Sequence, residues 1–411
     1  MHLPPILAAL TRHKLIVLLM IGTTAVTSAV ITNIAVMFVH RVELIHAPSG
    51  VDESQLVVVD SSKIYGDLGG SKPEKHDNRA QYQADLADLR GIEGVTAVAT
   101  LGGLPFGGGA AIGIGSSLDT SSDAVMQVTA FGGSPGAMSA LGLRLVQGRD
   151  FLKTEFLTAD NFNNLKSVSA AIISRDLANR LFHTKSAVGR LLYSSGHPIQ
   201  IVGVVDHLMG MNPQLGASDN EYALLLPLEP DGDEVTFALR TSRGNRAHVL
   251  QRAIAILGGR DPTRILDNAQ TFTQLRAQYF QREASMISLL LSAGVALLLV
   301  TAGGIMGLVS FWVRQRTRGI GIRRALGATR ADILRYFLAE NFLIVSAGVA
   351  LGCLLAILLN WLLVTYYEVQ VLPLGYLAIG ALALWLTGLI AGLSPALRGA
   401  SVPPAIATRS I

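Results

Sequence analysis

SMISLLLSAGVALLLVTAGGIMGLVSFWV (Ser285–Val313) is followed directly by RQRTRGIGIRRALGATRADILRYF (Arg314–Phe337), and this junction decides how the chain folds. The first stretch exceeds the roughly 20 apolar residues that a helix needs to cross a bilayer. The second stretch holds seven arginines and one acid, Asp332, between Arg314 and Arg335. Such an abrupt change from apolar to basic is typical of a helix that leaves a membrane on its cytoplasmic side.

Three more stretches are long and apolar enough to span a membrane, at Leu15–Val39, Asn341–Tyr367 and Val371–Leu397. None of the four stretches contains Asp, Glu, Lys, Arg or His. The composition agrees, because half of the 411 residues are apolar, 15% are charged and the mean hydropathy is +0.44. The first stretch is too long for a signal-peptide core and no A-x-A cleavage site closes it, so we expect it to be retained.

Basic residues at the ends of these stretches predict the orientation. They are Arg12 and Lys14 before the first, the 314–335 segment after the second, and Arg398 and Arg409 after the fourth. The turn between the third and fourth carries only Glu368. The positive-inside rule therefore places residues 1–14, 314–340 and 398–411 in the cytoplasm and residues 40–284 outside. The net charge of +4 belongs to this pattern, and we expect no binding of nucleic acid.

Residues 40–284 have the composition of a globular domain that mixes helices and strands. Strands are expected at Ser54–Asp60, Pro198–His207, Glu221–Leu228 and Glu234–Thr241, and units of one helix and one strand at Arg79–Ala99, Ser169–Phe182 and His248–Leu266. Thr271–Met286 predicts a helix that runs straight into the second span. The sequence thus predicts a membrane protein with four transmembrane helices and a large α+β ectodomain, in two lobes without a clear boundary, between the first and second helix.

Several ectodomain patterns do not amount to a chemical site. Gly102–Ser117 is rich in glycine but lacks the strand–GxGxxG–helix context of a phosphate loop, so we expect a mobile surface loop. His183, His197 and His207 fall on different elements without metal-ligand spacing, and we predict no metal site. No catalytic triad can be singled out. The single cysteine, Cys353, permits no intrachain disulfide.

The arginine-rich segment 314–340 predicts a helix that continues from the second span, a turn at Gly327 and a new helix from Arg330 into the third span. Thr329 and Asp332 have the spacing of a capping box at that new helix. Arginines at a membrane surface also bind anionic headgroups, but an ordered helix–turn–helix with its own apolar face predicts a docking surface for a cytoplasmic protein. The residues assigned to this surface are Arg316, Arg318, Ile320, Ile322, Arg323, Arg324, Ala325, Leu326, Gly327 and Thr329.

Glycines four residues apart recur in three of the spans, and this spacing lets helices approach closely in lipid. The predicted packing residues are Gly303 and Gly307, Gly348 and Gly352, and Gly388 and Gly392.

At Ile320–Ile344, IGIRRALGATRADILRYFLAENFLI resembles the signature of FtsX-like permeases of the MacB type of ABC transporter. Gly142–Phe151 and Ala171–Val205 resemble the periplasmic core domain of that family, and Leu393–Arg409 resembles its C-terminal ending. The family places an acid just before the IGIR-like run, where this chain has Gly319.

The resemblance implies that segment 314–340 contains the coupling helix, which contacts an ATPase. It implies a cytoplasmic ABC ATPase subunit, a second permease copy or paralogue, the lipid bilayer of a bacterial inner membrane and, in some systems, a periplasmic adaptor and outer-membrane channel. The chain has no G-x-x-x-x-G-K-[ST] motif, so we expect no cofactor in it and expect the partner to bind ATP and magnesium. The apolar stretches and this resemblance together predict a cytoplasmic N-terminus (1–14), a first span (15–39), a MacB-like periplasmic core ectodomain (40–284), a second span (285–313), a cytoplasmic coupling helix-turn-helix (314–340), a third span (341–367), a fourth span (371–397) and a cytoplasmic C-terminus (398–411).

The sequence is compatible with two functions. One is a non-catalytic permease subunit that couples ATP hydrolysis to periplasmic movement, for export of a peptide, antibiotic or lipid-linked substrate. The alternative is a regulatory protein, as FtsX itself is, that controls a periplasmic partner. A membrane-bound enzyme has no supporting constellation of residues.

Overall fold

The computed structural model describes residues 14–63, 78–117, 126–159, 165–183, 186–210, 221–261, 264–367 and 374–401. Those residues form two compact units, a membrane unit (residues up to 45 and from 282 onward) and an ectodomain (residues 46–281). The predicted tail features Arg12 and Arg409, and the predicted turn residue Glu368, lie outside the described ranges.

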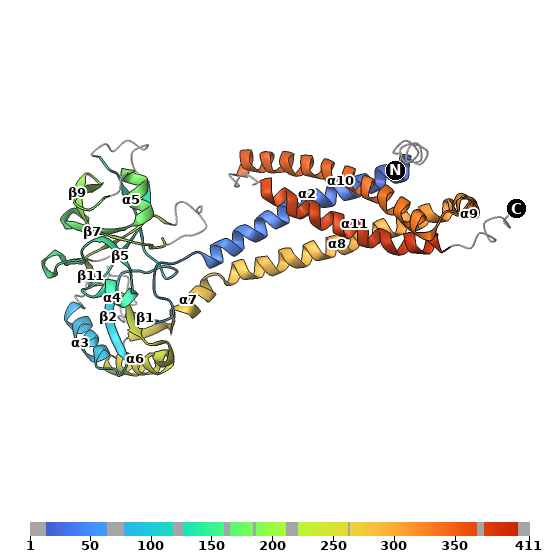
Figure 1. Ribbon diagram of the computed structural model, residues 1–411. Coiled ribbons are helices and arrows are strands. Elements are labelled where there is room, and N and C mark those ends of the chain that lie inside the picture. Colours follow the sequence, from blue (N-terminus) through green and yellow to red (C-terminus); the bar gives the residue numbers. More distant parts are fainter. Residues whose placement is uncertain are drawn as a thin grey trace, which may run out of the picture. The chain divides into compact units, whose positions relative to one another are not determined.

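Among its described residues, the membrane unit contains four long helices and one short helix, arranged as a bundle (Figure 1). The long helices are α2 (Lys14–His46), α8 (Gln281–Gln315), α10 (Arg330–Tyr367) and α11 (Leu374–Ala400), and the short one is α9 (Thr317–Ala325). Within the described residues, four helices are long and apolar enough to cross a membrane, over Lys14–His46, Gln281–Gln315, Arg330–Leu362 and Gly375–Ala400. The predicted order of one span, an ectodomain and three spans is therefore confirmed.

Small and hydroxyl-bearing residues let these helices pack closely. Gly348 and Gly352 on α10 lie against Thr24 and Ser28 of α2, and a Cβ atom added at either glycine would overlap those side chains. The hydroxyl of Thr27 lies 2.9 Å from that of Thr301 on α8. Close approach strengthens dispersion contacts, which matter in lipid because apolar burial gives little drive there.

The other two predicted glycine pairs differ in whether they contact a neighbouring helix. Gly388 and Gly392 on α11 face Val345 and Asn341 of α10, whereas Gly303 and Gly307 on α8 have no other group within 4 Å of an added Cβ.

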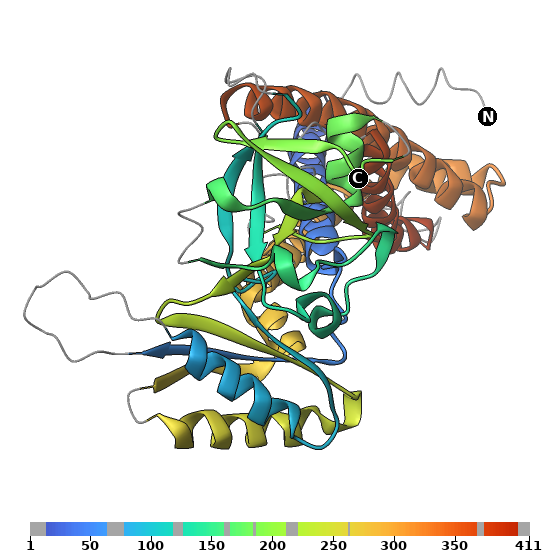
Figure 2. The same cartoon turned by 90° about the vertical axis from the view of Figure 1, so that its left-hand side faces the viewer.

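One lobe of the ectodomain, here the sheet lobe, comprises residues 46–101 and 234–281. Its elements are β1 (Leu56–Lys63), α3 (Arg79–Arg90), β2 (Val95–Leu101), β12 (Glu234–Thr241), α6 (Arg246–Arg260), β13 (Arg264–Thr271) and α7 (Phe272–Tyr279). The strand order is β13-β1-β12-β2 with every pair antiparallel, which is the split βαβ arrangement. Helices α3 and α6 cover one face of this sheet and bury its core against Phe237 and Val57 (Figure 2).

The second lobe, here the barrel lobe, spans residues 102–233 and is inserted between β2 and β12. Its strands are β3 (Ala110–Ile114), β4 (Met126–Gly132), β5 (Leu145–Gly148), β6 (Leu157–Ala159), β7 (Ala170–Ser174), β8 (Leu191–Ser194), β9 (His197–Val205), β10 (Ala223–Leu226) and β11 (Leu228–Pro230). Helices α4 (Ala137–Leu141) and α5 (Arg175–Phe182) accompany them, with short 3₁₀ turns at Lys153–Glu155 and Leu165–Ser167. Seven strands form one sheet in the order β3-β4-β10-β7-β9-β5, with β8 also on β9. Paired backbone hydrogen bonds of 2.9 Å between Gly115 and Tyr193 join its β3 and β8 ends, so the sheet curls into a barrel.

Three sequence expectations were wrong in detail. The glycine-rich segment Gly102–Ser117 is not a free surface loop, because it forms a tight turn with Leu104 and Phe106 buried and then strand β3. The helix expected to run from residue 271 into the second span is interrupted at Phe280, between α7 and α8. The helix expected to continue beyond the second span is broken at Arg316, because its φ of −103° and ψ of 7° leave the helical region.

Candidate coupling site

The arginine-rich segment folds into helix α9, a tight turn and the first turns of α10. Gly327 follows α9 with a φ of 101°, a left-handed conformation that glycine adopts without steric cost. Thr329 then caps α10: its hydroxyl accepts a 3.2 Å hydrogen bond from the Asp332 amide, and the Asp332 carboxylate accepts one of 3.1 Å from the Thr329 amide. The predicted capping box is therefore confirmed, and the angle between α9 and α10 is set by local hydrogen bonds.

Helix α9 turns one apolar side chain inward and one outward, and its C-cap residue Leu326 also points outward. Ile320 is 5% exposed and packs into the bundle core with Ile333 and Phe337 of α10. Ile322 is 49% exposed and Leu326 is 83% exposed. An exposed apolar pair on a short helix between two membrane spans is a feature of interaction surfaces.

The remaining residues assigned to the docking surface lie around this pair. Arg323, Ala325, Gly327 and Thr329 are exposed, and Arg316 and Arg324 are half-buried. The side chain of Arg318 lies outside the described part of the structure.

A buried carboxylate, Glu340 on α10, holds the break between α8 and α9. One guanidinium nitrogen of Arg316 lies 3.1 Å from each of its two carboxylate oxygens. The Glu340 side chain is 2% exposed and that of Arg316 is 21% exposed. The guanidinium also stacks 4.7 Å from the ring centroid of Trp312 on α8, which adds a cation–π contact. Arg316, at the break, is thereby joined to α8 and to α10.

Sequence reasoning missed Glu340 because it precedes by one residue the apolar run that begins at Asn341. The signal that could have found it is helical spacing, because Glu340 lies three residues after Phe337 and four before Ile344, on the face that becomes the core.

A small, mostly apolar cavity adjoins the Arg316–Glu340 pair. It is lined by Met20, Val309, Trp312, Phe337, Glu340, Asn341 and Ile344. The Asn341 amide donates a 2.7 Å hydrogen bond to the Gly388 carbonyl of α11. Its side-chain oxygen is buried and has no hydrogen-bond partner among the described residues. The residues that line the cavity come from α2, α8 and α10.

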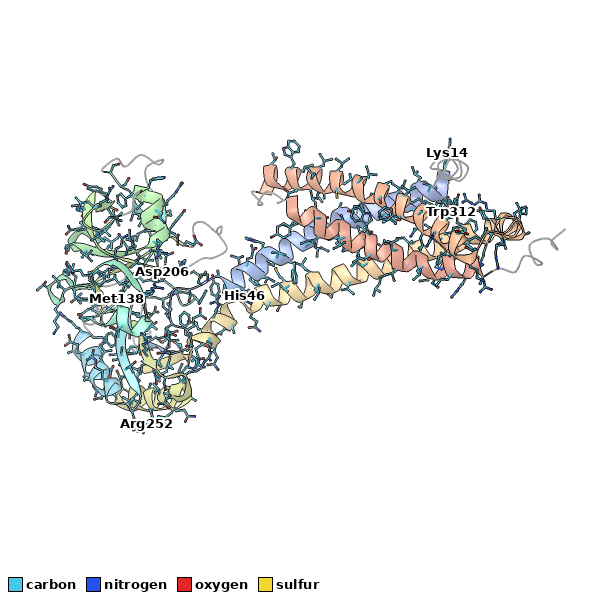
Figure 3. The ribbon with its side chains drawn as sticks, viewed as in Figure 1. Lys14, His46, Met138, Asp206, Arg252 and Trp312 are labelled. Atoms are coloured by element: carbon cyan, nitrogen blue, oxygen red, sulfur yellow. The ribbon has the colours of Figure 1, made fainter. Side chains whose placement is uncertain are left out.

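A second arginine, Arg323, ties α9 to α10. Its guanidinium lies 5.0 Å from the ring centroid of Tyr336. Trp312 and Lys14 lie toward the end of the bundle that carries α9 (Figure 3). Basic residues on α2 and around α9 thus gather at one end of the membrane unit, as the positive-inside reading of the sequence requires.

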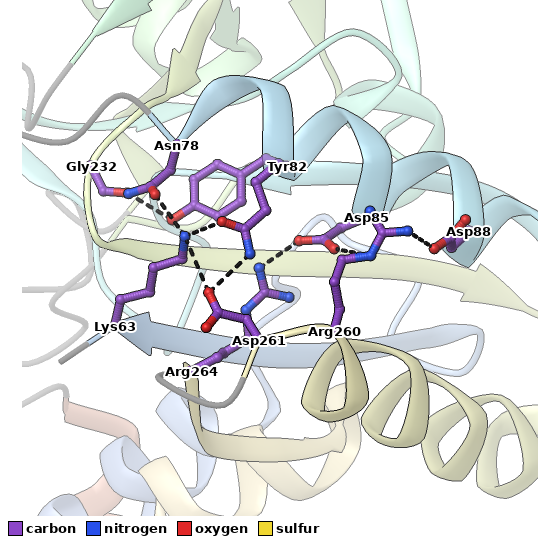
Figure 4. Close-up of polar contacts among 10 residues, drawn as sticks. Lys63, Asn78, Tyr82, Asp85, Asp88, Gly232, Arg260, Asp261 and Arg264 are labelled. Atoms are coloured by element: carbon purple, nitrogen blue, oxygen red, sulfur yellow. Dashed lines mark hydrogen bonds and ion pairs between the residues drawn. The ribbon is translucent and has the colours of Figure 1, made fainter. Parts of the chain in front are cut away.

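The sheet lobe contains a separate polar network between α3 and β13 (Figure 4). Asp85 and Arg264, both with fully buried side chains, form an ion pair of 2.5 Å, and Arg260 approaches Asp85 to 3.4 Å. Lys63 donates a 2.6 Å hydrogen bond to Asn78 and lies 3.5 Å from Asp261. Burial lowers the pKa of Lys63 below its ordinary value, although the nearby carboxylate of Asp261 opposes that shift.

This network braces α3 against β13 and the end of α6. Its cations and carboxylates face one another, and the described residues contain no group of three His, Cys, Asp or Glu side chains arranged to hold a metal ion. The three histidines of the sequence analysis are dispersed, and His207 lies 3.7 Å from Asp176.

Comparison with known proteins gives the family. The model of the MacB-like periplasmic core domain matches residues 16–265, and that of the FtsX-like permease C-terminal domain matches residues 291–404. The chain belongs to the MacB-type, FtsX-like permeases. This multi-pass membrane permease is of the ABC transporter type, as its motifs at 320–344 and 142–205 indicated.

Curated relatives of the permease include three that differ in length. An uncharacterized ABC transporter permease, YknZ of Bacillus subtilis, is 26% identical over 68% of this chain and 70% of its own length. The macrolide export ATP-binding/permease protein MacB of Nitrosomonas europaea is 29% identical over 65% of this chain and 40% of its own length. The pyoverdine export ATP-binding/permease protein PvdT of Pseudomonas aeruginosa is 28% identical over 59% and 38%. The permease thus spans about 40% of the length of relatives whose names include ATP binding.

The departure at Gly319 is accommodated without distortion in this permease. Gly319 is exposed on α9, and a Cβ added there would meet no other group within 4 Å. An acid at this position would fit, so its absence is not enforced by packing. Glu340 is a carboxylate that pairs with the coupling-site residue Arg316.

Proposed function

We propose that this permease couples a separate cytoplasmic ABC ATPase to conformational change of its ectodomain, in a bacterial inner membrane with the ectodomain in the periplasm. The observation that carries the proposal is the outward-facing apolar pair Ile322 and Leu326. Exposed apolar side chains in an aqueous loop are stabilised when a partner covers them, and the surrounding arginines suit an acidic rim on that partner. ATP and magnesium are bound by the ATPase.

The way α9 is fixed supports this proposal. A docking helix transmits force only if it cannot turn independently of the spans. Arg316–Glu340 and Arg323–Tyr336 restrain it against α10, and Trp312 restrains it against α8. A load on Leu326 is therefore borne by the membrane helices.

The substrate class proposed for the complex is that of an exporter. The names of MacB and PvdT include macrolide export and pyoverdine export, which favour export of a peptide, antibiotic or lipid-linked molecule. The complex would contain a second permease copy or paralogue, and a periplasmic adaptor with an outer-membrane channel would complete the route.

Replacement of Leu326 by glutamate tests the docking surface without disturbing the bundle, because this side chain is 83% exposed. We expect at least a tenfold loss of the ATPase that co-purifies with the chain, since about 1.4 kcal/mol of lost contact already produces that factor. Arg335→Gln is the matched control: it removes a positive charge from the exposed start of α10 but leaves the apolar pair intact. The proposal is refuted if Leu326→Glu retains the same amount of ATPase and the same ATP hydrolysis as the unmodified chain.

Charge reversal at Arg324 is the second arm of this experiment. It should weaken ATPase binding without reducing insertion into the membrane. Arg323 is a poorer test, because its contact with Tyr336 makes its loss a change in the shape of α9 as well.

A further inference from the structure

The residue that joins the two connectors of the ectodomain is Arg276, on α7. The N-terminal connector is the segment Ala47–Glu53, which follows α2, and the C-terminal connector is α7, which precedes α8. Arg276 donates a 2.7 Å hydrogen bond to the Ala47 carbonyl and forms an ion pair with Glu53. One guanidinium therefore holds together the two points at which the chain enters and leaves this domain.

The N-terminal connector is in turn built into the barrel lobe. The Met209 amide donates a 3.0 Å hydrogen bond to the Ser49 carbonyl, and the Asp52 amide donates one of 3.0 Å to the Leu141 carbonyl. Gly50 lies between them with a φ of 84°, and a Cβ added there would overlap the His207 carbonyl. The connector and the barrel lobe are therefore in direct backbone contact at this point.

The barrel lobe also reaches α7 directly, through the glycine-rich turn that leaves β2. At its tip Phe106 adopts a φ of 69°, an uncommon conformation for a residue with a bulky side chain. Its ring centroid lies 5.7 Å from that of Phe272, the first residue of α7, and 5.4 Å from that of Phe280, which follows the last. The Arg276 guanidinium lies 5.4 Å from the Phe106 ring centroid. The strained turn is held by this aromatic contact, with Phe106 6% exposed.

We propose that Arg276 is the positioning residue of a transmission joint that makes the barrel lobe follow α7. Arg276 fastens the N-terminal connector and Phe106 to one face of that helix. Because α8 begins at Gln281, directly after the Phe280 break, displacement of α8 reaches α7 first. The joint then passes it to the barrel lobe by two routes, through the connector to Leu141 and Met209 and through Phe106 to β3. The biological role of this joint rests on the proposed function, but its existence can be tested without an ATPase.

The experiment measures the distance between the two lobes in the full chain, reconstituted in lipid nanodiscs. Spin labels are attached to cysteines replacing Arg252 on α6 and Arg180 on α5, both exposed, in a Cys353→Ser background. Arg276→Gln removes the charge and the stacking, and Phe106→Leu removes the ring at an unchanged backbone. We expect either change to raise the population outside the original distance range about tenfold, the factor that corresponds to about 1.4 kcal/mol. Arg276→Lys, which retains the charge for Glu53 but loses the planar stack, should recover part of the original distribution.

Two controls separate the joint from general loosening. Leu257→Ala destabilises the fully buried core of the sheet lobe without touching α7, and Arg149→Gln breaks an exposed ion pair with Glu155 in the barrel lobe. Both should leave the distance distribution unchanged. An unchanged distribution in Arg276→Gln and Phe106→Leu would overturn the proposal, as would equal broadening in Leu257→Ala. Failure of the proposed function has a different signature, namely ATPase binding that is insensitive to Leu326→Glu while the joint variants still broaden the distances.

Discussion

Removal of the Glu340 carboxylate should release α9 from the membrane bundle. Deleting one partner of a buried ion pair costs about 3–5 kcal/mol, because the remaining charge is left without compensation. Arg316 is 21% exposed and keeps its stacking on Trp312, so the lower end, about 3 kcal/mol, applies. At 1.4 kcal/mol per factor of ten, the population in which α9 has separated from α10 rises about 100-fold in Glu340→Ala.

The assay follows a cysteine at Ile320, which is 5% exposed and is uncovered when α9 separates from the bundle. In a Cys353→Ser background, its labelling by a membrane-impermeant maleimide is proportional to the open population when opening is fast relative to labelling. We expect about a 100-fold faster reaction in Glu340→Ala, and a smaller increase in Glu340→Gln, which keeps a hydrogen-bond acceptor for Arg316.

A cysteine at Leu326 provides the matched control, because that position is 83% exposed in the closed arrangement and should react at the same rate in every variant. The double change Arg316→Met with Glu340→Leu should return the Ile320 site to slow labelling, since an apolar pair replaces the ion pair without leaving an unpaired charge. If Glu340→Ala labels at Ile320 no faster than the parent, the reasoning that this pair restrains α9 is wrong.

Three further outcomes follow from contacts elsewhere in the chain. Asp85→Ala should lower the free energy of unfolding of the ectodomain by about 3–5 kcal/mol in a urea titration, whereas Asp85→Leu combined with Arg264→Met should be close to neutral. Gly352→Leu should destabilise the membrane unit by about 1–3 kcal/mol in a thermal melt, because the new side chain overlaps Ser28 of α2. The pKa of Lys63 is lower in the folded chain than its unfolded value of 10.5, so the unfolded chain binds more protons in the window below pH 10.5. The free energy of unfolding should therefore rise with pH across that window, relative to the Lys63→Met variant. A free energy of unfolding that falls there would contradict this sign.

The architecture was accessible from sequence because it depends on patterns that are local. Four apolar stretches give four helices, and the run EVTFALRT at Glu234–Thr241 becomes a strand with the predicted bounds, whereas other predicted strands are shifted by one to three residues at their ends. The capping box at Thr329 was also predictable, since both partners lie within one turn. Hydrophobic period and capping chemistry decide such features before any long-range contact forms.

The contacts that restrain the elements were not accessible in the same way. Arg316 and Glu340 are 24 residues apart, and Arg276 and Glu53 are 223 residues apart. Neither pairing leaves a periodic signal in the sequence. Phe106 lies in a glycine-rich segment that was predicted to be a mobile loop. That reading failed because a buried aromatic contact outweighs the local flexibility of glycine.

The same type of arginine contact, formed by Arg276 and by Arg316, occurs at both ends of α8. That helix begins after a break at Phe280 and ends before a break at Arg316. A break in a helix creates a pivot, and a pivot dissipates displacement unless a side chain fixes its angle. Arg276 lies just before the first break and Arg316 lies at the second, each paired with a carboxylate and stacked on an aromatic ring. Arginine suits this task because its planar guanidinium can stack and form an ion pair at once, which a lysine ammonium cannot do equally well. Under the proposed coupling function, a helix braced in this way at each end would carry a displacement from one end to the other, and loss of either brace should uncouple the ends without unfolding the helix.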